Sequence, residues 1–220
     1  MTTDSAPGAR AEWHASRTAN LCVRGARYVT GSDIVRVSRA LALEPWHLTQ
    51  TAPAAADDPT GIVTHGGRRR VNLRLANGPY GCVFLLRTAG GLGHCGLGEL
   101  APLSCRAFPA QLGEGAAAAA AAAAKKSPGG SGQLTEADLD DELLADAKRG
   151  WTADRDHWFE VVERWNALPD ESGGGGGSGS GSSAGSGADD ESGIRDFQRY
   201  LLETHAAREA GTAWPGEADR

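Results

Sequence analysis

Residues 81–109 read GCVFLLRTAGGLGHCGLGELAPLSCRAFP and contain three of the four cysteines of the 220-residue chain. The order along the whole chain is Cys22-x59-Cys82-x12-Cys95-x9-Cys105. No two of these cysteines form a C-x2-C pair, so their spacing alone is only a weak indication of a shared metal site. Free cysteine is also a common core residue, and Cys82 is followed by an apolar run. Simple packing is therefore the alternative interpretation of the thiols.

Charge divides the chain into a basic and an acidic part. Residues 18–112 contain ten arginines and five acidic residues, a net charge of +5, whereas residues 113–220 carry −11 and the whole chain carries −6. All four cysteines lie in the basic part. Positive charge favours the thiolate, which is the form that binds metal, so the arginines would balance a cluster of thiolates. The alternative is a solvated basic face that rests on the acidic C-terminal helices of the same chain.

The pattern of apolar residues predicts an α+β fold of short strands and helices, interrupted by low-complexity segments. Apolar positions recur at helical spacing after Thr30, which has the chemistry of a helix cap, and they alternate with polar positions over residues 71–75. The expected elements, in chain order, are a helix from about Thr30 to Pro45, a connection over 51–67, a strand at 71–75, a turn at 78–81, a strand at 82–86, a helical turn after Pro102, helices over 135–147 and 153–166, a Gly/Ser tether at 172–187 and a helix over 194–207.

The residues around the last three cysteines resemble the YkgJ-type cysteine-cluster family, which is described as zinc- or iron-chelating. Its usual pattern is a C-V-F-L segment followed by C-x-I-Y-x-x-R-P-x-x-C-R-x-F-P. Residues 82–85 match the first segment, and residues 95–109 have the family interval between the cysteines with Pro102, Arg106, Phe108 and Pro109 in register. Gly98 and Ala101 depart from the pattern, since they stand where the family has an aromatic residue and an arginine. Upstream, Cys22 and the D-x-x-R of Asp33 and Arg36 are similar to the family's first motif. The resemblance covers about residues 18–112. It implies a small irregular domain stabilised by one metal centre, whose ligands are Cys22, Cys82, Cys95 and Cys105.

Two interpretations of the metal site follow from departures from the family pattern. Family members usually have three or four cysteines in the first motif, whereas only Cys22 is present here. One interpretation is a degenerate domain that has lost its metal. The other is a retained site with one cysteine per motif, the number that a tetrahedral zinc ion or one iron–sulfur cluster needs. We favour the retained site, and thiolate ligands do not discriminate between these two cofactors. His94, beside Cys95, is a further candidate donor.

These features are compatible with three functions from different classes. The first is a cytoplasmic zinc- or iron–sulfur-binding protein with a structural or regulatory centre. The second is an iron–sulfur oxidoreductase or a protein-modification factor of the flagellin methylase type, and the third is a metal-free interaction module. We assign no catalytic residue, since no phosphate-binding loop or dinucleotide motif is present and no histidine is placed to activate a cysteine. We therefore lean against an enzyme, and a protein partner of unknown identity is possible.

Nucleic acid and membrane are not expected partners. The chain is acidic overall, with few aromatic residues near its one arginine run, and no apolar run is long enough to cross a bilayer. The N-terminus lacks the pattern of a secretory signal, which points to a reducing compartment. The expected segments are a disordered N-terminus (1–17), a cysteine-cluster domain (18–112), an Ala/Gly-rich linker (113–133), a helical extension (134–168), a Gly/Ser-rich linker (169–193), a C-terminal helix packing on the domain (194–210) and a disordered tail (211–220).

Overall fold

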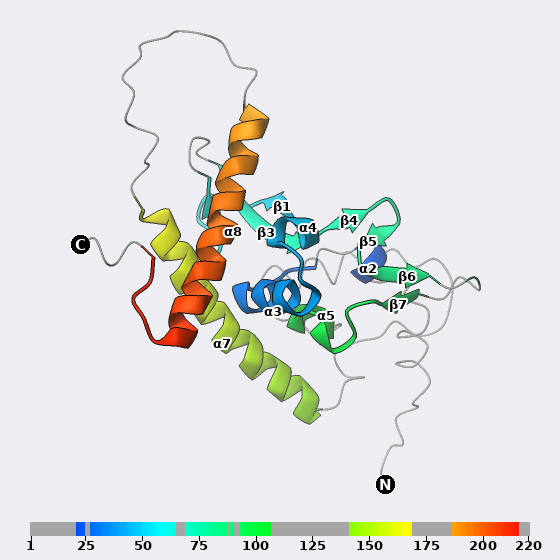
Figure 1. Cartoon of the computed structure of the whole chain (residues 1–220). Helices are drawn as coiled ribbons and strands as arrows, with labels where there is room; N and C mark the ends of the chain where they lie inside the picture. Colours follow the sequence, from blue (N-terminus) through cyan, green and yellow to red (C-terminus); the bar gives the residue numbers. More distant parts are fainter. Residues whose placement is uncertain are drawn as a thin grey trace.

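The computed structural model describes residues 21–24, 27–64, 69–87, 89, 93–106, 141–168 and 186–215. Figure 1 shows two long helices that cross one another along one side of the molecule, with short helices and small sheets packed against them. The elements are α2 (Leu21–Arg24), α3 (Gly31–Leu41), α4 (Pro45–Leu48), β1 (Thr49–Pro53), β2 (Ile62–Val63), β3 (Arg70–Leu75), β4 (Asn77–Gly78), β5 (Gly81–Cys82), β6 (Leu85–Arg87), β7 (Gly93–Cys95), η1 (Gly98–Leu100), α5 (Leu103–Arg106), α7 (Asp141–Asn166) and α8 (Ser186–Ala210).

Helix α3 begins where its cap residues predict. The backbone N–H of Asp33 donates to the Thr30 hydroxyl, and the backbone N–H of Thr30 donates to the Asp33 carboxylate, each at 3.3 Å. This reciprocal capping box satisfies two backbone donors that the first turn cannot satisfy itself. The helix ends at Leu41, and the cap residue Ala42 that follows has a left-handed φ of 52°. Ile34 is completely buried, whereas Leu41, which was expected on the same apolar stripe, is exposed.

The main sheet is antiparallel, with the strand order β1-β3-β2. Strand β3 alternates between half-buried and buried positions, which confirms the strand predicted at residues 71–75. Strands β1 and β2 were missed, because residues 51–67 were expected to form only a connection. Strand β1 has the polar sequence TQTAP, with a proline at the edge of the sheet, so its conformation depends on pairing with β3.

The apolar run at residues 82–86 does not form one strand. Strands β4 and β5 make a hairpin through the predicted turn, and β6 pairs separately with β7. Between them the chain turns at Val83 and Phe84. The Val83 N–H donates to the Ala76 carbonyl at 3.1 Å, and the Gly96 N–H donates to the Phe84 carbonyl at 2.7 Å. The run is therefore divided because its two halves find different backbone partners.

The expected pair of helices over 135–147 and 153–166 is, in its described part, one continuous helix, α7. Gly150, which separates the two predicted apolar stripes, lies inside this helix, and a Cβ atom there would lie 3.3 Å from the side chain of Leu103. Helix α8 begins at Ser186, so its first turns include residues that were expected to belong to the linker at 169–193. The expectations for residues 1–17 and 113–133 and for a helix start at Thr135 lie outside the described residues.

Both long helices belong to the main core of the protein. Phe197 of α8 makes edge-on contacts with Trp158 and Trp165 of α7, with ring centroids 5.6 Å and 5.5 Å apart. Helix α3 starts at the same place, since a Cβ atom on Gly31 would lie 2.8 Å from Leu201 and 2.9 Å from Trp158. The buried cluster extends from these residues to the main sheet and to the cysteines. The fold is α+β, and its helices complete the core of the cysteine-containing part.

The segment that was expected to be a disordered tail (211–220) is described up to residue 215, and residues 216–220 lie outside the described residues. Trp214 contacts the ring of His157, and the guanidinium of Arg164 lies 4.1 Å from the centre of the Trp214 ring. This part of the chain therefore packs on α7. Across the residues that the structure describes, no helix is both long enough and apolar enough to cross a membrane.

Candidate metal centre

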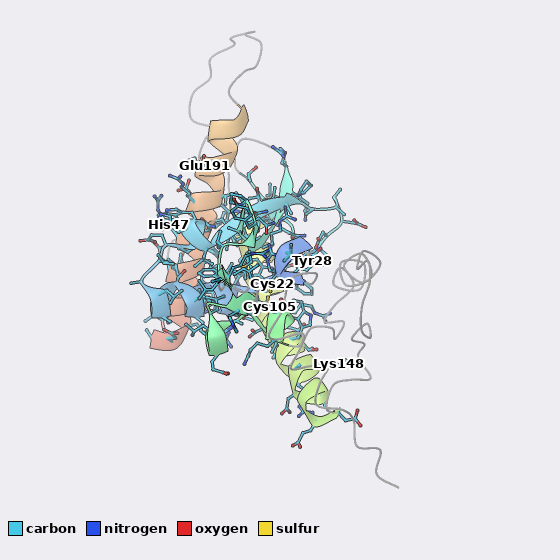
Figure 2. The ribbon with its side chains drawn as sticks, turned by 90° about the vertical axis from the view of Figure 1, so that its right-hand side faces the viewer. Cys22, Tyr28, His47, Cys105, Lys148 and Glu191 are labelled. Carbon is cyan, nitrogen blue, oxygen red and sulfur yellow. The ribbon has the colours of Figure 1, made fainter. Side chains whose placement is uncertain are left out.

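The four cysteines come from four short elements: α2, β5, β7 and α5. Cys22, Cys82 and Cys105 are buried and Cys95 is half-buried, and all four are free thiols. Figure 2 shows Cys22 and Cys105 close together in the middle of the molecule. The geometry that brings these elements together depends on neighbouring residues.

A glycine allows α2 to lie directly on β5. Gly81 has a φ of +117°, and a Cβ atom there would lie only 2.5 Å from the carbonyl oxygen of Cys22. The buried guanidinium of Arg27 donates to the same Cys22 carbonyl at 3.2 Å and also bonds the side chain of Asn77. Because L-residues rarely adopt such a φ, glycine at position 81 permits Cys22 to approach Cys82.

The segment that bears Cys95 and Cys105 is held by α3. Arg36 donates to the carbonyl of Glu99 at 3.2 Å and to that of Ala101 at 3.4 Å, while the Leu103 N–H donates to the Asp33 carboxylate at 3.4 Å. Next to Cys105, the Ser104 hydroxyl donates to the Tyr28 carbonyl at 2.6 Å. These contacts fix the position of the short helix α5 beneath the other cysteines.

The thiols affect one another's ionisation. Burial raises the pKa of the Cys105 thiol, and the neighbouring Cys22, Cys82 and Cys95 raise it further. Burial also raises the pKa of Cys82, although a backbone hydrogen bond from Phe84 and the charge of Arg27 act in the opposite direction. The thiol form is therefore favoured at neutral pH for Cys82 and Cys105, even with the Arg27 guanidinium near Cys82. Cys22, Cys82 and Cys105 belong to the same buried core and Cys95 packs against it, and we refer to these four residues as the cysteine cluster.

The cluster is not a closed coordination shell. In the described ranges, no three histidine, cysteine or acidic side chains are arranged so that they could hold one metal ion. His94 is exposed and is paired through its backbone with Leu86, opposite to it in the β6–β7 ladder. The donor chemistry, four thiols from separate elements, fits a soft metal or cluster, but these elements must move closer together to bind it.

The arginines of the basic part have several different roles. Burial raises the pKa of Cys82, and the charge of Arg27 opposes this rise, as expected for a cation near a thiolate. Arg39 instead pairs with Glu209 of α8 at 2.6 Å, which agrees with the alternative of basic residues resting on the acidic C-terminal helices. Of these two arginines, Arg27 therefore acts on a thiol, as the predicted charge compensation requires, and Arg39 does not.

Sequence reasoning identified the four cysteines but missed the residues that arrange them. Gly81 and Arg27 are recognised only once α2 and β5 are known to touch. The sequence does contain Gly81 directly before Cys82, but a glycine at this position is also typical of the preceding turn, so it did not predict the close approach of α2.

Comparison with known proteins yields no assignment: no family model, no curated protein and no solved structure matches this chain. The resemblance to the cysteine-cluster family therefore stays a prediction, and the function has to be inferred from the arrangement of the residues themselves.

Proposed function

We propose that the protein binds one metal centre, a zinc ion or an iron–sulfur cluster, through Cys22, Cys82, Cys95 and Cys105, and that this centre stabilises the cysteine-containing part. The observation that supports the proposal is that four free thiols, from elements far apart in the sequence, share one core, with Cys22, Cys82 and Cys105 buried in it and Cys95 packed against it. The net positive charge of residues 18–112 and the resemblance of these residues to a metal-chelating family also support a metal centre.

Deprotonation of the cluster needs a compensating positive charge. Burial opposes the thiolate form of Cys82 and Cys105, and each further thiolate would oppose the next. When bound, a metal would supply that charge and link four elements that are otherwise joined by a few backbone contacts. The N–H of Phe84 and the guanidinium of Arg27 already favour a thiolate at Cys82. Because ligation would close the cluster, binding free energy would also be folding free energy.

The test is elemental analysis and absorbance spectroscopy of protein purified without oxygen or added metal. We expect about one zinc per chain without colour, or iron and sulfide with a band near ~400 nm, as four thiolates permit either. The variant Cys105→Ser should lose the metal, while Glu99→Gln, which changes an exposed side chain and keeps all four thiols, should retain it. A chelator should lower the melting temperature of the wild type and of Glu99→Gln, but not that of Cys105→Ser.

A second candidate is a metal-free interaction module whose cysteines serve as core residues. It is favoured by the absence of a closed ligand group in the described part of the chain and by the burial of Cys22, Cys82 and Cys105 within the apolar core. In this case a variant with all four cysteines changed to alanine should remain folded, and no metal should bind even after refolding with zinc or with iron and sulfide. That outcome would contradict the metal proposal.

The enzyme alternative has a separate signature. Reversible loss of visible absorbance on reduction would favour an iron–sulfur oxidoreductase or modification factor over a structural centre, whereas a colourless zinc-loaded protein would exclude the enzyme alternative.

We also propose a reducing compartment such as the cytoplasm, since free thiols persist there. A protein partner would find exposed apolar side chains next to the cluster at Tyr80, Val83 and Leu86.

A further inference from the structure

A cleft lies on the other side of the core, between the main sheet and α8, with α4 at one end. Figure 1 shows α8, α4, β1 and β3 together, away from the end that holds α2, β6 and β7. The cleft has a volume of about 380 Å³, which lies within the usual range of about 300–1,000 Å³ for small-molecule sites. None of the four cysteines contributes to its lining, so it is independent of the metal proposal.

The base of the cleft contains a buried hydrogen-bond acceptor in need of a donor. Gln198 of α8 is 1% exposed, and its Nε2 atom donates to the Thr49 hydroxyl at 2.8 Å. That hydroxyl donates its own proton to the carbonyl of Pro45 at 2.9 Å, so it can only accept from Gln198. This relay fixes the orientation of the amide. The Gln198 Oε1 atom is left without a hydrogen-bond partner among the described residues.

The cleft lining contains two guanidinium groups, those of Arg69 and Arg195, whose N–H donors suit an anion, and one carboxylate, that of Glu191. The Arg195 guanidinium bonds Glu191 at 2.6 Å and lies 5.7 Å from the centre of the Trp46 ring. A guanidinium retains further N–H donors after one such bond, and its planar fork matches a carboxylate.

The walls of the cleft are suited to a flat apolar body. Trp46 lines one side, and Val71 and Leu73 of β3 together with Ile194 of α8 provide apolar surface. Cations at the mouth, an aromatic wall and an unpaired acceptor at the base define three contacts for one small molecule. An apolar body alone would leave the amide oxygen unpaired, and an inorganic anion would leave the apolar walls uncovered.

We propose that this cleft binds a small planar organic acid, whose carboxylate contacts Arg69 and Arg195, whose ring packs against Trp46, and whose far end donates a hydrogen bond to Gln198. Hydroxylated aromatic carboxylates belong to this chemical class. The site is a binding site, and the residues that line it provide no nucleophile with an adjacent base.

The experiment compares three probes of nearly equal size by isothermal titration calorimetry on the full chain as purified. The probes are 4-hydroxybenzoate, 4-methoxybenzoate, which lacks the donor, and 4-hydroxybenzamide, which lacks the charge. We expect 4-hydroxybenzoate to bind with a submillimolar Kd and each of the other two to bind about tenfold more weakly, the effect of one unpaired buried polar group or one lost charged contact.

Two variants and a control separate the contacts. Arg195→Gln should weaken 4-hydroxybenzoate about tenfold and leave 4-hydroxybenzamide unchanged. Gln198→Met should abolish the preference for the hydroxyl over the methoxy probe. Arg149→Gln, at an exposed position on α7 outside the cleft lining, should change neither affinity. Absence of binding at 5 mM ligand, or equal affinity for all three probes, would overturn the proposal, and the metal content of the same sample reports separately on the cysteine cluster.

Discussion

Lowering the pH should destabilise the protein through a pair of histidines between α7 and α8. The rings of His157 and His205 lie 5.0 Å apart, and the Nε2 atom of each is buried without a hydrogen-bond partner among the described residues. Burial lowers the pKa of His205 from 6.5 to about 4, with further lowering by His157, Arg208 and Arg39, and only Glu209 acts against them. Burial likewise lowers the pKa of His157.

The sign and size of the effect follow from linkage. In the unfolded chain His205 becomes protonated below pH 6.5, whereas in the folded chain it stays neutral down to about pH 4. The contribution of the neutral histidine to stability is therefore complete above pH 6.5 and is lost as the pH falls from 6.5 to about 4. At about 1.36 kcal/mol per pKa unit, the full difference corresponds to about 3.4 kcal/mol. Since His157, which contacts His205, is only half-buried, solvent screening reduces this value, and we expect ~1.5 kcal/mol by pH 4.5.

The assay is urea unfolding at pH 7.5, 6.0, 5.0 and 4.5, followed by tryptophan fluorescence. Wild type and His205→Gln are compared, because the variant removes the titrating group while carboxylates elsewhere titrate in both proteins. The free energy of unfolding of the wild type should fall ~1.5 kcal/mol further over this range than that of the variant. His47→Gln, which changes an exposed histidine, should follow the wild type. Parallel curves for the wild type and His205→Gln would refute the reasoning.

Three further substitutions test the packing. Phe197→Ala removes a fully buried ring between two tryptophans and should cost about 3–5 kcal/mol in chemical unfolding, and a loss below about 1 kcal/mol would contradict this packing. Gly81→Ala should cost roughly 2–3 kcal/mol and reduce the metal content, because its Cβ would collide with the Cys22 carbonyl; unchanged melting would show that α2 does not lie on β5. Asn166→Ala should cost about 2 kcal/mol, since Asn166 bonds the Val63 N–H at 2.8 Å and the Gly61 carbonyl at 2.9 Å, and a Val63 amide that stays equally protected from hydrogen exchange would argue against it.

Local signals predicted the elements that depend on local chemistry. Helix α3 followed from a cap and a helical period, and β3 followed from strict alternation, because both patterns act within a few residues. The edge strands β1 and β2 were missed because their pairing with β3, rather than their own composition, makes them strands. Gly150 separated two predicted helices in the sequence, yet in the fold it provides space for Leu103.

The candidate site was accessible to sequence reasoning only in part. The four cysteines could be selected from motif resemblance, whereas their burial and mutual electrostatic influence depend on contacts between residues that are up to about eighty positions apart. The cleft beside α8 had no signal at all. Gln198, which provides the hydrogen-bond acceptor, is one of many polar residues on a helix with both acidic and basic side chains. Its role is recognised only when the hydrogen bonds through Thr49 to Pro45 are seen to fix the orientation of its amide.

Helix α3 connects the crossing of α7 and α8 to the segment that bears Cys95 and Cys105, so that a change in the position of one affects the other. Its first residue, Gly31, lies against Trp158 of α7 and Leu201 of α8, so the spacing of the two long helices sets the position of α3. Two and five residues later, Asp33 and Arg36 hold the segment that bears Cys95 and Cys105. A bulkier side chain at the helix crossing would therefore displace two thiols through a rigid intermediate, and ligation of the thiols would in turn restrain the angle at which α7 and α8 cross.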